Sequence, residues 1–370
     1  MPGPDIFQEA NRQLIICNAC RYCEGYCPVF RAIEMRRDFN QGDVFYLSNL
    51  CHDCRACYYA CMFTPPHEFA INIPKILAEA RIETYERWGW PGFLARAFKN
   101  RGITVVLAAA VAAIAVALSL LMIPASNLFA MHVGPGAFYE VVPYVAMVIG
   151  GLILFFYAIA VWMRGGARFW LETRSVLHQT SGFEALASAI TAALGLRYLK
   201  GGGPGCFYPE ERPSPVRRIY HSLTSWGLLS DFASTTLAFI YQDFFHRLPP
   251  YPLTSAPVIF GTVGGLALII GTGGLIWIKL RSDRQPEGTG ASGMDYLFLI
   301  TLGLTALTGM LTLILRTTAA MGSMLILHLA LIAALFVTAP YGKFVHFVYR
   351  SLALIRYEIE QRQPQKHVGH

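Results

Sequence analysis

Long apolar runs dominate the chain beyond about residue 101, whereas the preceding part mixes short apolar stretches with polar residues, Pro and Gly. Each of six runs holds about 20 residues or more, enough for a helix to cross the hydrocarbon core of a bilayer. The predicted spans are roughly 103–123, 138–163, 219–245, 257–279, 296–315 and 319–340. The pattern therefore predicts an all-α membrane protein with a polar N-terminal domain.

These boundaries divide the chain into an N-terminal domain (1–100), a six-span transmembrane domain (101–350) and a tail (351–370). The loop 165–218 contains RFWLETRSVLHQ and EALASAITAALGLRYL, whose apolar residues recur with a helical period. We expect amphipathic interfacial helices there. The pair Gly261 and Gly265 forms a GxxxG pattern that predicts close packing between helices.

Composition supports a membrane location, since 54% of the residues are hydrophobic and only 14% are charged. The net charge of +7 does not indicate nucleic-acid binding, because the basic residues flank apolar segments and form no stripe with aromatics. They gather in the loops after the second and fourth spans and in the tail, whereas the opposite side has only Arg247 and Arg316. The positive-inside rule then predicts a bacterial cytoplasmic membrane protein with both termini cytoplasmic. The N-terminus does not read as a secretory signal, so we expect its cysteines to stay in the reducing cytosol.

Eight of the nine cysteines form two runs with the spacing C-x2-C-x2-C-x3-C, which begin at Cys17 and Cys51. In this pattern three thiolates ligate one [4Fe–4S] cluster, and the fourth ligates the other cluster. The first predicted ligand set is Cys17, Cys20, Cys23 and Cys61. The second predicted ligand set is Cys51, Cys54, Cys57 and Cys27.

Structural zinc is the alternative, although zinc modules generally use separated CxxC pairs and need only four ligands per ion. We expect the remaining cysteine, Cys206, to be a passive thiol that does not ligate a cluster. Tyr22, Phe30, Tyr58 and Phe63 would screen the sulfur atoms from water or simply pack a small domain.

Four histidines occur in matched phase on two predicted helices. His221 and His246 lie 25 positions apart, within about 20° of one helix face. His328 and His346 lie 18 positions apart, which is five whole turns. Facing imidazoles can supply the axial ligands of b-type haem, so we expect the pairs His221 with His346 and His246 with His328. The alternative is interfacial anchoring, and His178 in the loop is a spare candidate.

Asp231 places a carboxylate inside the third span, where it would serve a proton path to a quinone or bond nearby hydroxyls. The sequence contains no dinucleotide fingerprint, Walker loop or nucleophile elbow. We therefore expect no site for an organic substrate in this chain. Such clusters and haems move single electrons. We therefore expect the chain to transfer electrons between a soluble flavoprotein and the membrane.

Several stretches resemble one family along nearly the whole chain: CNACRYCEGYCPVF, NLCHDCRACYYAC, PPHEFAINIPKILAEAR, GGGPGCFYP, RRIYHSLTSWG and APYGKFVHFVYRS. They look like the tricarballylate/citrate-utilisation membrane electron-transfer proteins of the TcuB type. The resemblance implies a helical ferredoxin-like domain and a bundle similar to the haem b subunit of nitrate reductase. It also implies that the protein reoxidises the reduced FAD of a partner dehydrogenase and passes electrons to the quinone pool.

Two other interpretations remain open at this point. The same electron-transfer chain would equally serve a flavoprotein of corrinoid biosynthesis. Nothing in the sequence distinguishes this pathway from tricarballylate or citrate utilisation. A zinc-stabilised membrane scaffold without a redox role is the interpretation from another class, and it predicts a colourless protein.

Overall fold

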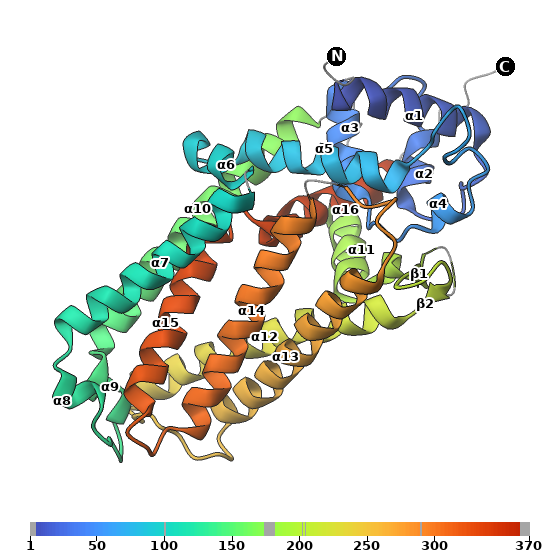
Figure 1. Ribbon diagram of the computed structural model, residues 1–370. Helices are drawn as coiled ribbons and strands as arrows, with labels where there is room; N and C mark the ends of the chain where they lie inside the picture. Colours follow the sequence, from blue (N-terminus) through green and yellow to red (C-terminus); the bar gives the residue numbers. More distant parts are fainter. Residues whose placement is uncertain are drawn as a thin grey trace.

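The computed structural model describes residues 5–99, 101–173, 182–201, 203, 205–288 and 291–362. A helical N-terminal domain caps one end of a bundle of long helices, and both ends of the chain lie at that end (Figure 1).

Six helices build the N-terminal domain: α1 (Ile6–Cys20), α2 (Pro28–Glu34), α3 (Gln41–Leu50), α4 (Ala56–Tyr59), α5 (Ile73–Trp88) and α6 (Gly92–Lys99). Polar side chains cap the first turns of α1, α3 and α5, because the first backbone N–H groups of a helix lack internal partners. The side chain of Asn40 accepts from the Asp43 N–H at 3.0 Å, and Asp43 accepts in return from the Asn40 N–H. Buried Leu14, Phe45 and Leu77 fill the core between the helices.

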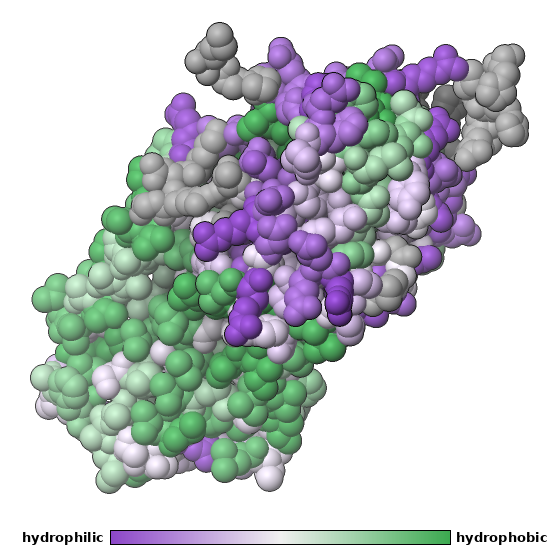
Figure 2. Space-filling model, turned by 45° about the vertical axis from the view of Figure 1, so that its right-hand side comes forward, coloured by the Kyte–Doolittle hydropathy of each residue, from purple (hydrophilic) through white to green (hydrophobic). Residues whose placement is uncertain are grey.

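Five helices are long and apolar enough to cross a membrane within the part of the chain that the structure describes. They are Ile103–Met122 in α7 (Arg101–Met122), α10 (Tyr144–Glu172), α13 (Ala256–Arg281), Gly293–Ile314 in α14 (Ala291–Ile314) and α15 (Met321–Thr338). Hydrophobic residues cover the bundle, whereas hydrophilic residues concentrate toward the N-terminal domain (Figure 2). The arrangement fits a membrane protein.

The third predicted span forms α12 (Val216–Asp243), which is not among those five helices. The reason is its polar content, including Asp231 and several Ser and Thr residues. Its 28 residues would still extend about 42 Å. Arg217 contacts the N-terminal domain at one end, and Asp243 accepts a hydrogen bond from Tyr144 near the other. The helix therefore runs the length of the bundle.

Glycines allow α12 and α13 to pack closely. A Cβ added to Gly264 would meet an Asp231 side-chain oxygen at 2.2 Å, and one added to Gly271 would meet Thr224 Oγ1 at 2.5 Å. The predicted GxxxG pair also lies in close packing, with Gly261 against Ser234 and Gly265 against Met310. The backbones of two helices can approach this closely only where side chains are absent.

Short elements connect the long helices. Near the far end lie α8 (Ala125–Leu128) and α9 (Ala137–Val141), so the second span begins later than the sequence predicted and continues to Glu172. Between α10 and α12 lie α11 (Gly182–Leu194), η1 (Arg197–Lys200), β1 (Cys206–Phe207) and β2 (Pro213–Ser214), with the two strands antiparallel. The helix predicted around 184–199 is thus present, while residues 174–181, including His178, lie outside the described residues.

The predicted tail is largely a structural helix. After η2 (Lys343–Val345), α16 (His346–Gln361) packs between the N-terminal domain and α11. Its buried residues Tyr349, Ala353 and Tyr357 recur at helical spacing and join the same core cluster as Phe45 and Leu77. The C-terminal segment therefore anchors the N-terminal domain to the bundle.

Candidate functional site

The first cysteine set lines one small cavity at the surface of the N-terminal domain. Cys17, Cys20, Cys23 and Cys61 all contribute to its wall, together with Tyr22, Phe30, Met62 and Phe63. Helix α1 ends just before this turn, because Arg21 adopts a left-handed conformation with φ of 54°. The chain then reverses, and Cys23 follows Cys20 around the same cavity.

The second cysteine set lies deeper. Cys27 precedes the first turn of α2, Cys51 follows α3, and Cys57 lies in α4. Asp53 and Arg55 both have positive φ, and these two tight bends turn the loop around Cys54. The Asp53 N–H points at Cys51 Sγ, 3.4 Å away.

The chemistry of the thiols supports both groupings. Burial and then the neighbouring Cys61, Cys23 and Cys20 thiols raise the pKa of Cys17 to about 12. Burial and then Cys51 likewise raise the pKa of Cys27 to about 12. The thiols would therefore be protonated without a metal, and binding iron would require and stabilise their thiolate forms.

Single-ion sites fit the arrangement poorly. Among the described residues, no three His, Cys, Asp or Glu side chains are grouped so as to hold one metal ion. The ligands of one zinc ion converge on a point, whereas those of a cubane bond to different iron atoms and lie further apart. The residues present therefore fit clusters better than zinc.

The structure brings His221 of α12 and His346 of α16 together. Their ring centres lie 6.4 Å apart, and the ring planes cross at 86°. A metal held about 2 Å from each facing nitrogen would place the ring centres roughly 6 Å apart. The spacing fits two axial ligands of one haem iron.

Hydrogen bonds leave the facing nitrogens available. His346 Nδ1 lies 2.7 Å from the carbonyl oxygen of Lys343, which can only accept, so Nδ1 carries the proton. His221 Nδ1 lies 3.1 Å from Ser225 Oγ. This is the usual arrangement of metal-ligating histidines, whose second nitrogen is held by a neighbouring acceptor. Burial, then Lys343 and Arg350, hold the pKa of His346 well below its usual range, which favours the neutral form that binds iron.

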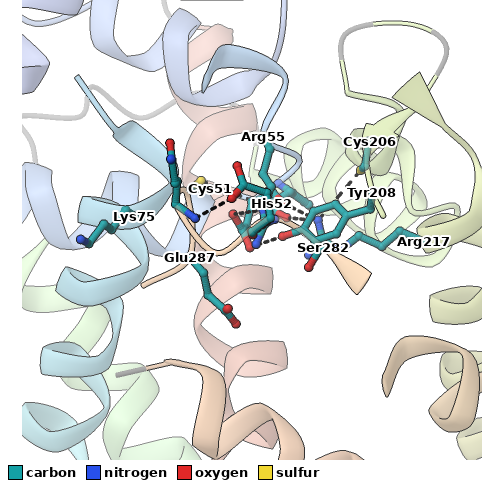
Figure 3. A network of polar contacts seen from close by, with 12 residues as sticks. Cys51, His52, Arg55, Lys75, Cys206, Tyr208, Arg217, Ser282 and Glu287 are labelled. Atoms are coloured by element: carbon teal, nitrogen blue, oxygen red, sulfur yellow. Dashed lines mark hydrogen bonds and ion pairs between the residues drawn. The ribbon is translucent and has the colours of Figure 1, made fainter. Parts of the chain in front are cut away.

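Two arginines connect the histidine pair to the second cysteine set. Arg217, one turn before His221, donates to the carbonyls of His52 (2.9 Å) and Asp53. Arg350, one turn after His346, donates to the carbonyl of Cys51. Figure 3 shows the first of these contacts, with Arg217 reaching the loop of Cys51 and His52 beside Tyr208. The loop of Cys51 is thus joined through one arginine to the helix of each histidine, one helical turn from the imidazole.

The structure corrects the prediction, made from helical periodicity, that His246 and His328 form a second pair of haem ligands. Helix α12 ends at Asp243, so His246 lies beyond it, exposed and with φ of 53°. His328 Nδ1 instead lies 3.0 Å from the carbonyl oxygen of Thr305 in α14. No contact between His246 and His328 is present among the described residues.

The remaining candidates also have defined places. One side-chain oxygen of Asp231 is buried without a hydrogen-bond partner, directly against Gly264 of α13. Cys206 is fully buried, with its thiol 3.3 Å from the carbonyl of Leu199, as expected of a passive thiol. Lys343 forms an ion pair with Asp295 at 2.7 Å.

Sequence reasoning missed the arginines as a group. Arg217 belongs to the basic loop that the sequence pattern assigns to membrane topology, and the pattern does not single out Arg81. Arg81 donates to the carbonyls of Ser48 at 2.7 Å and Cys51 at 2.6 Å. A signal was available, because Arg217 and Arg350 each lie four residues from a candidate haem ligand and therefore share its helix face.

Comparisons with known proteins agree along the whole chain. The family described as citrate utilization protein B matches residues 96–367, and its Fer4-like domain matches residues 10–87. Citrate utilization protein B of Escherichia coli is 40% identical over 361 residues, which cover 96% of this chain and 93% of that protein. No solved structure matches the chain.

Proposed function

The chain belongs to the citrate utilization protein B family, and from that premise we propose that it is a membrane electron-transfer subunit. It would accept electrons from the reduced FAD of a soluble dehydrogenase of citrate or tricarballylate utilisation and deliver them to quinone. The Fer4-like domain and the clustered cysteines suggest an iron–sulfur electron-transfer role in citrate utilisation, and the partner and the acceptor are our additions.

In this proposal the two cysteine sets each hold one [4Fe–4S] cluster, and His221 with His346 hold one haem b. When bound, these groups supply one-electron carriers. The thiolates fix the clusters, and the hydrogen bond from His346 Nδ1 to Lys343 orients that imidazole toward the iron. Because His246 is exposed, the chain supports one bis-histidine site better than two.

The partner dehydrogenase would dock over the first cysteine set. Cys20 is exposed, and the neighbouring Tyr22 and Met62 leave 61% and 69% of their surfaces accessible. In contrast, Cys51 and Cys54 are buried. Electron transfer weakens steeply with distance, so a flavin on another protein can be reached only from the exposed set.

Quinone would bind in a groove of about 530 Å³ between α12 and α13. Its walls are mostly apolar, but Arg218, Ser222 and Ser230 place polar groups along it, as a quinone carbonyl requires. Ser222 directly follows the proposed ligand His221. Asp231, whose unpartnered oxygen lies against the groove residue Gly264, would supply protons, since quinone reduction takes up two electrons and two protons.

We further propose that α12 is a sixth membrane crossing. An even number of crossings agrees with the N-terminal domain and α16 lying at one end of the bundle (Figure 1). The basic residues of the long loop and of the loop after α13 favour the cytoplasm for this end, and a bacterial cytoplasmic membrane for the protein.

The observation that carries the proposal is the contact of Arg217 and Arg350 with the Cys51–Asp53 loop, one helical turn from the two histidines. The test is an anaerobic purification in detergent with visible spectra before and after dithionite. A sharp b-type haem band on a broad iron–sulfur background supports the proposed electron-transfer function. A colourless protein that contains zinc would instead identify a scaffold.

A further inference from the structure

We propose that three arginines around the Cys51–Asp53 loop make the centre at the second cysteine set easier to reduce than the centre at the first. Electrons would then move inward, from the exposed set toward the histidine pair. This inference rests on the proposed function, which already takes electrons from flavin to quinone, and it adds the relative reduction potentials of the two centres.

The arginines come from three different helices. Arg81 of α5 donates to the carbonyls of Ser48 and Cys51. Arg350 of α16 donates to the same Cys51 carbonyl, and Arg217 of α12 donates to the next two carbonyls in the chain. Three guanidinium groups therefore converge on one loop that begins at the proposed ligand Cys51 and ends next to the proposed ligand Cys54.

One carboxylate, that of Asp53, offsets part of this positive charge by acting electrostatically on Arg217. Within the described parts of the chain, no ion pair joins Arg81, Arg217 or Arg350 to an acidic side chain, and Arg350 Nε is buried without a partner. Asp53, the nearest acid on the loop, accepts from Tyr208 and lies 4.0 Å from Arg55. A buried cationic site of this kind is stable when it holds an anion.

The arginines also act on the second set's thiols. Arg350 interacts electrostatically with Cys51, and Arg217 with Cys54. A cluster held by four thiolates is negatively charged and gains one more negative charge on reduction. Nearby positive charge therefore favours its reduced state.

The first set lacks this environment. In the first run, exposed Arg21 donates its backbone N–H to the Cys17 carbonyl and its Nε to the Asn18 carbonyl. No guanidinium group among the described residues donates to Cys17, Cys20, Cys23 or Cys61, whose electrostatic neighbours are chiefly one another. Water that reaches the exposed Cys20 also favours the reduced state there. Solvent screens charges at the surface, however, whereas Arg81 is buried and Arg217 and Arg350 are only partly exposed, so their charges are screened less and the second set has the larger advantage.

The consequence is that the inward step between the two centres is downhill, while the flavin and quinone couples set the overall direction. Each electron that moves inward leaves the centre at the first set oxidised and the centre at the second set reduced, and no bond forms or breaks. The reductant is the flavin hydroquinone of the proposed partner, and the final oxidant is the quinone.

The test is a potentiometric titration of the full-length protein in detergent, followed by electron paramagnetic resonance. Cys20→Ser assigns the signal of the first set, because it changes the ligands of that centre alone. We expect the other signal to appear at the higher potential. Arg350→Gln should shift only that signal to lower potential, and Arg350→Lys should restore most of the shift.

Arg356→Gln is the matched control, since Arg356 is fully buried on the same helix but donates to the carbonyl of Trp170. Arg217→Gln repeats the test if the Arg350 variant does not fold. The inference would fail if neither Arg350→Gln nor Arg217→Gln changed the midpoint potential of either cluster. It would also fail if the cluster at the first set had the higher potential. In both cases the proposed function would stand. A protein without clusters would overturn the proposed function as well.

Discussion

The imidazole rings of His221 and His346 face each other across the bundle, 6.4 Å apart between centres and at 86°. They lie 125 positions apart in the chain. One helical turn from each histidine, Arg217 and Arg350 donate hydrogen bonds to carbonyls of the same Cys51–Asp53 loop. The pair is thus placed relative to the N-terminal domain by the same contacts that join this domain to the membrane helices.

Replacing either histidine should remove the haem b. We expect His346→Ala to lose the reduced b-type band completely, because a six-coordinate iron cannot keep its site with one ligand missing. The measurement is the dithionite-reduced minus oxidised visible spectrum of the purified variant. The iron–sulfur background should remain.

His246→Ala is the control for this experiment, since His246 is exposed beyond the end of α12. Its spectrum should match that of the unmodified protein. Retention of the full band in His346→Ala would rule out the proposed ligand pair, and loss of band intensity in His246→Ala would restore the second predicted haem.

Removing one cysteine from a set should remove one cluster. Cys54→Ala should lower iron and acid-labile sulfide by about half, because two clusters of equal composition are expected. Cys206→Ala provides a matched control, as Cys206 is equally buried and packs in the same small core cluster as Cys54. Equal losses in both variants would show that the effect comes from packing, and no loss in Cys54→Ala would exclude it as a ligand.

The sequence was sufficient to group the cysteines of the first set, because their spacing carries the geometry, while the ligand roles of both sets stay predictions. Three cysteines two residues apart can only wrap around a compact group, so Cys17, Cys20 and Cys23 could be grouped without any knowledge of the fold. Cys61 joined them by the same rule, and the structure places all four around one cavity. Five apolar spans were equally clear, since length and composition decide them.

The histidines and arginines depend on tertiary contacts, which periodicity cannot supply. The phase argument treated 219–245 as one continuous helix, but the helix ends at Asp243 and leaves His246 outside it. Likewise, the sequence alone cannot distinguish a basic residue that determines membrane topology from one that binds another domain of the same chain. Only the fold shows that Arg217 faces the carbonyls of His52 and Asp53.

Filling the groove between α12 and α13 should slow reduction of quinone. Ala267 lines the groove, so Ala267→Phe should lower the rate about tenfold, in line with the cost of overfilling a packed site. The measurement is the rate at which ubiquinone-1 reoxidises the dithionite-reduced haem in a stopped-flow instrument. Asp231→Asn should also slow this reaction while leaving the haem spectrum unchanged.

Leu266→Phe is the control, because Leu266 is exposed on the same helix but does not line the groove. It should reoxidise at the normal rate. If Ala267→Phe and Leu266→Phe reoxidise equally fast, the groove holds lipid and the quinone binds elsewhere.

Two glycines on α13 offer a stability test of the packing that positions α12. Gly264→Ala would place a methyl group against Asp231 and against the Gly227 carbonyl, and should destabilise the protein by about 1–3 kcal/mol. Gly273→Ala meets no atom within 4 Å and should stabilise the helix by up to about 1 kcal/mol. Thermal unfolding in detergent, followed by circular dichroism, measures both changes.

The haem band distinguishes local from global effects in the same two variants. Because α12 carries His221, separating it from α13 should weaken the haem site along with the fold, so Gly264→Ala should lose haem at a lower temperature than the parent protein. Gly273→Ala should retain it. If Gly264→Ala melts like the parent, α12 is not held by this close contact, and the position of His221 must depend on Arg217 and the cysteine loop instead.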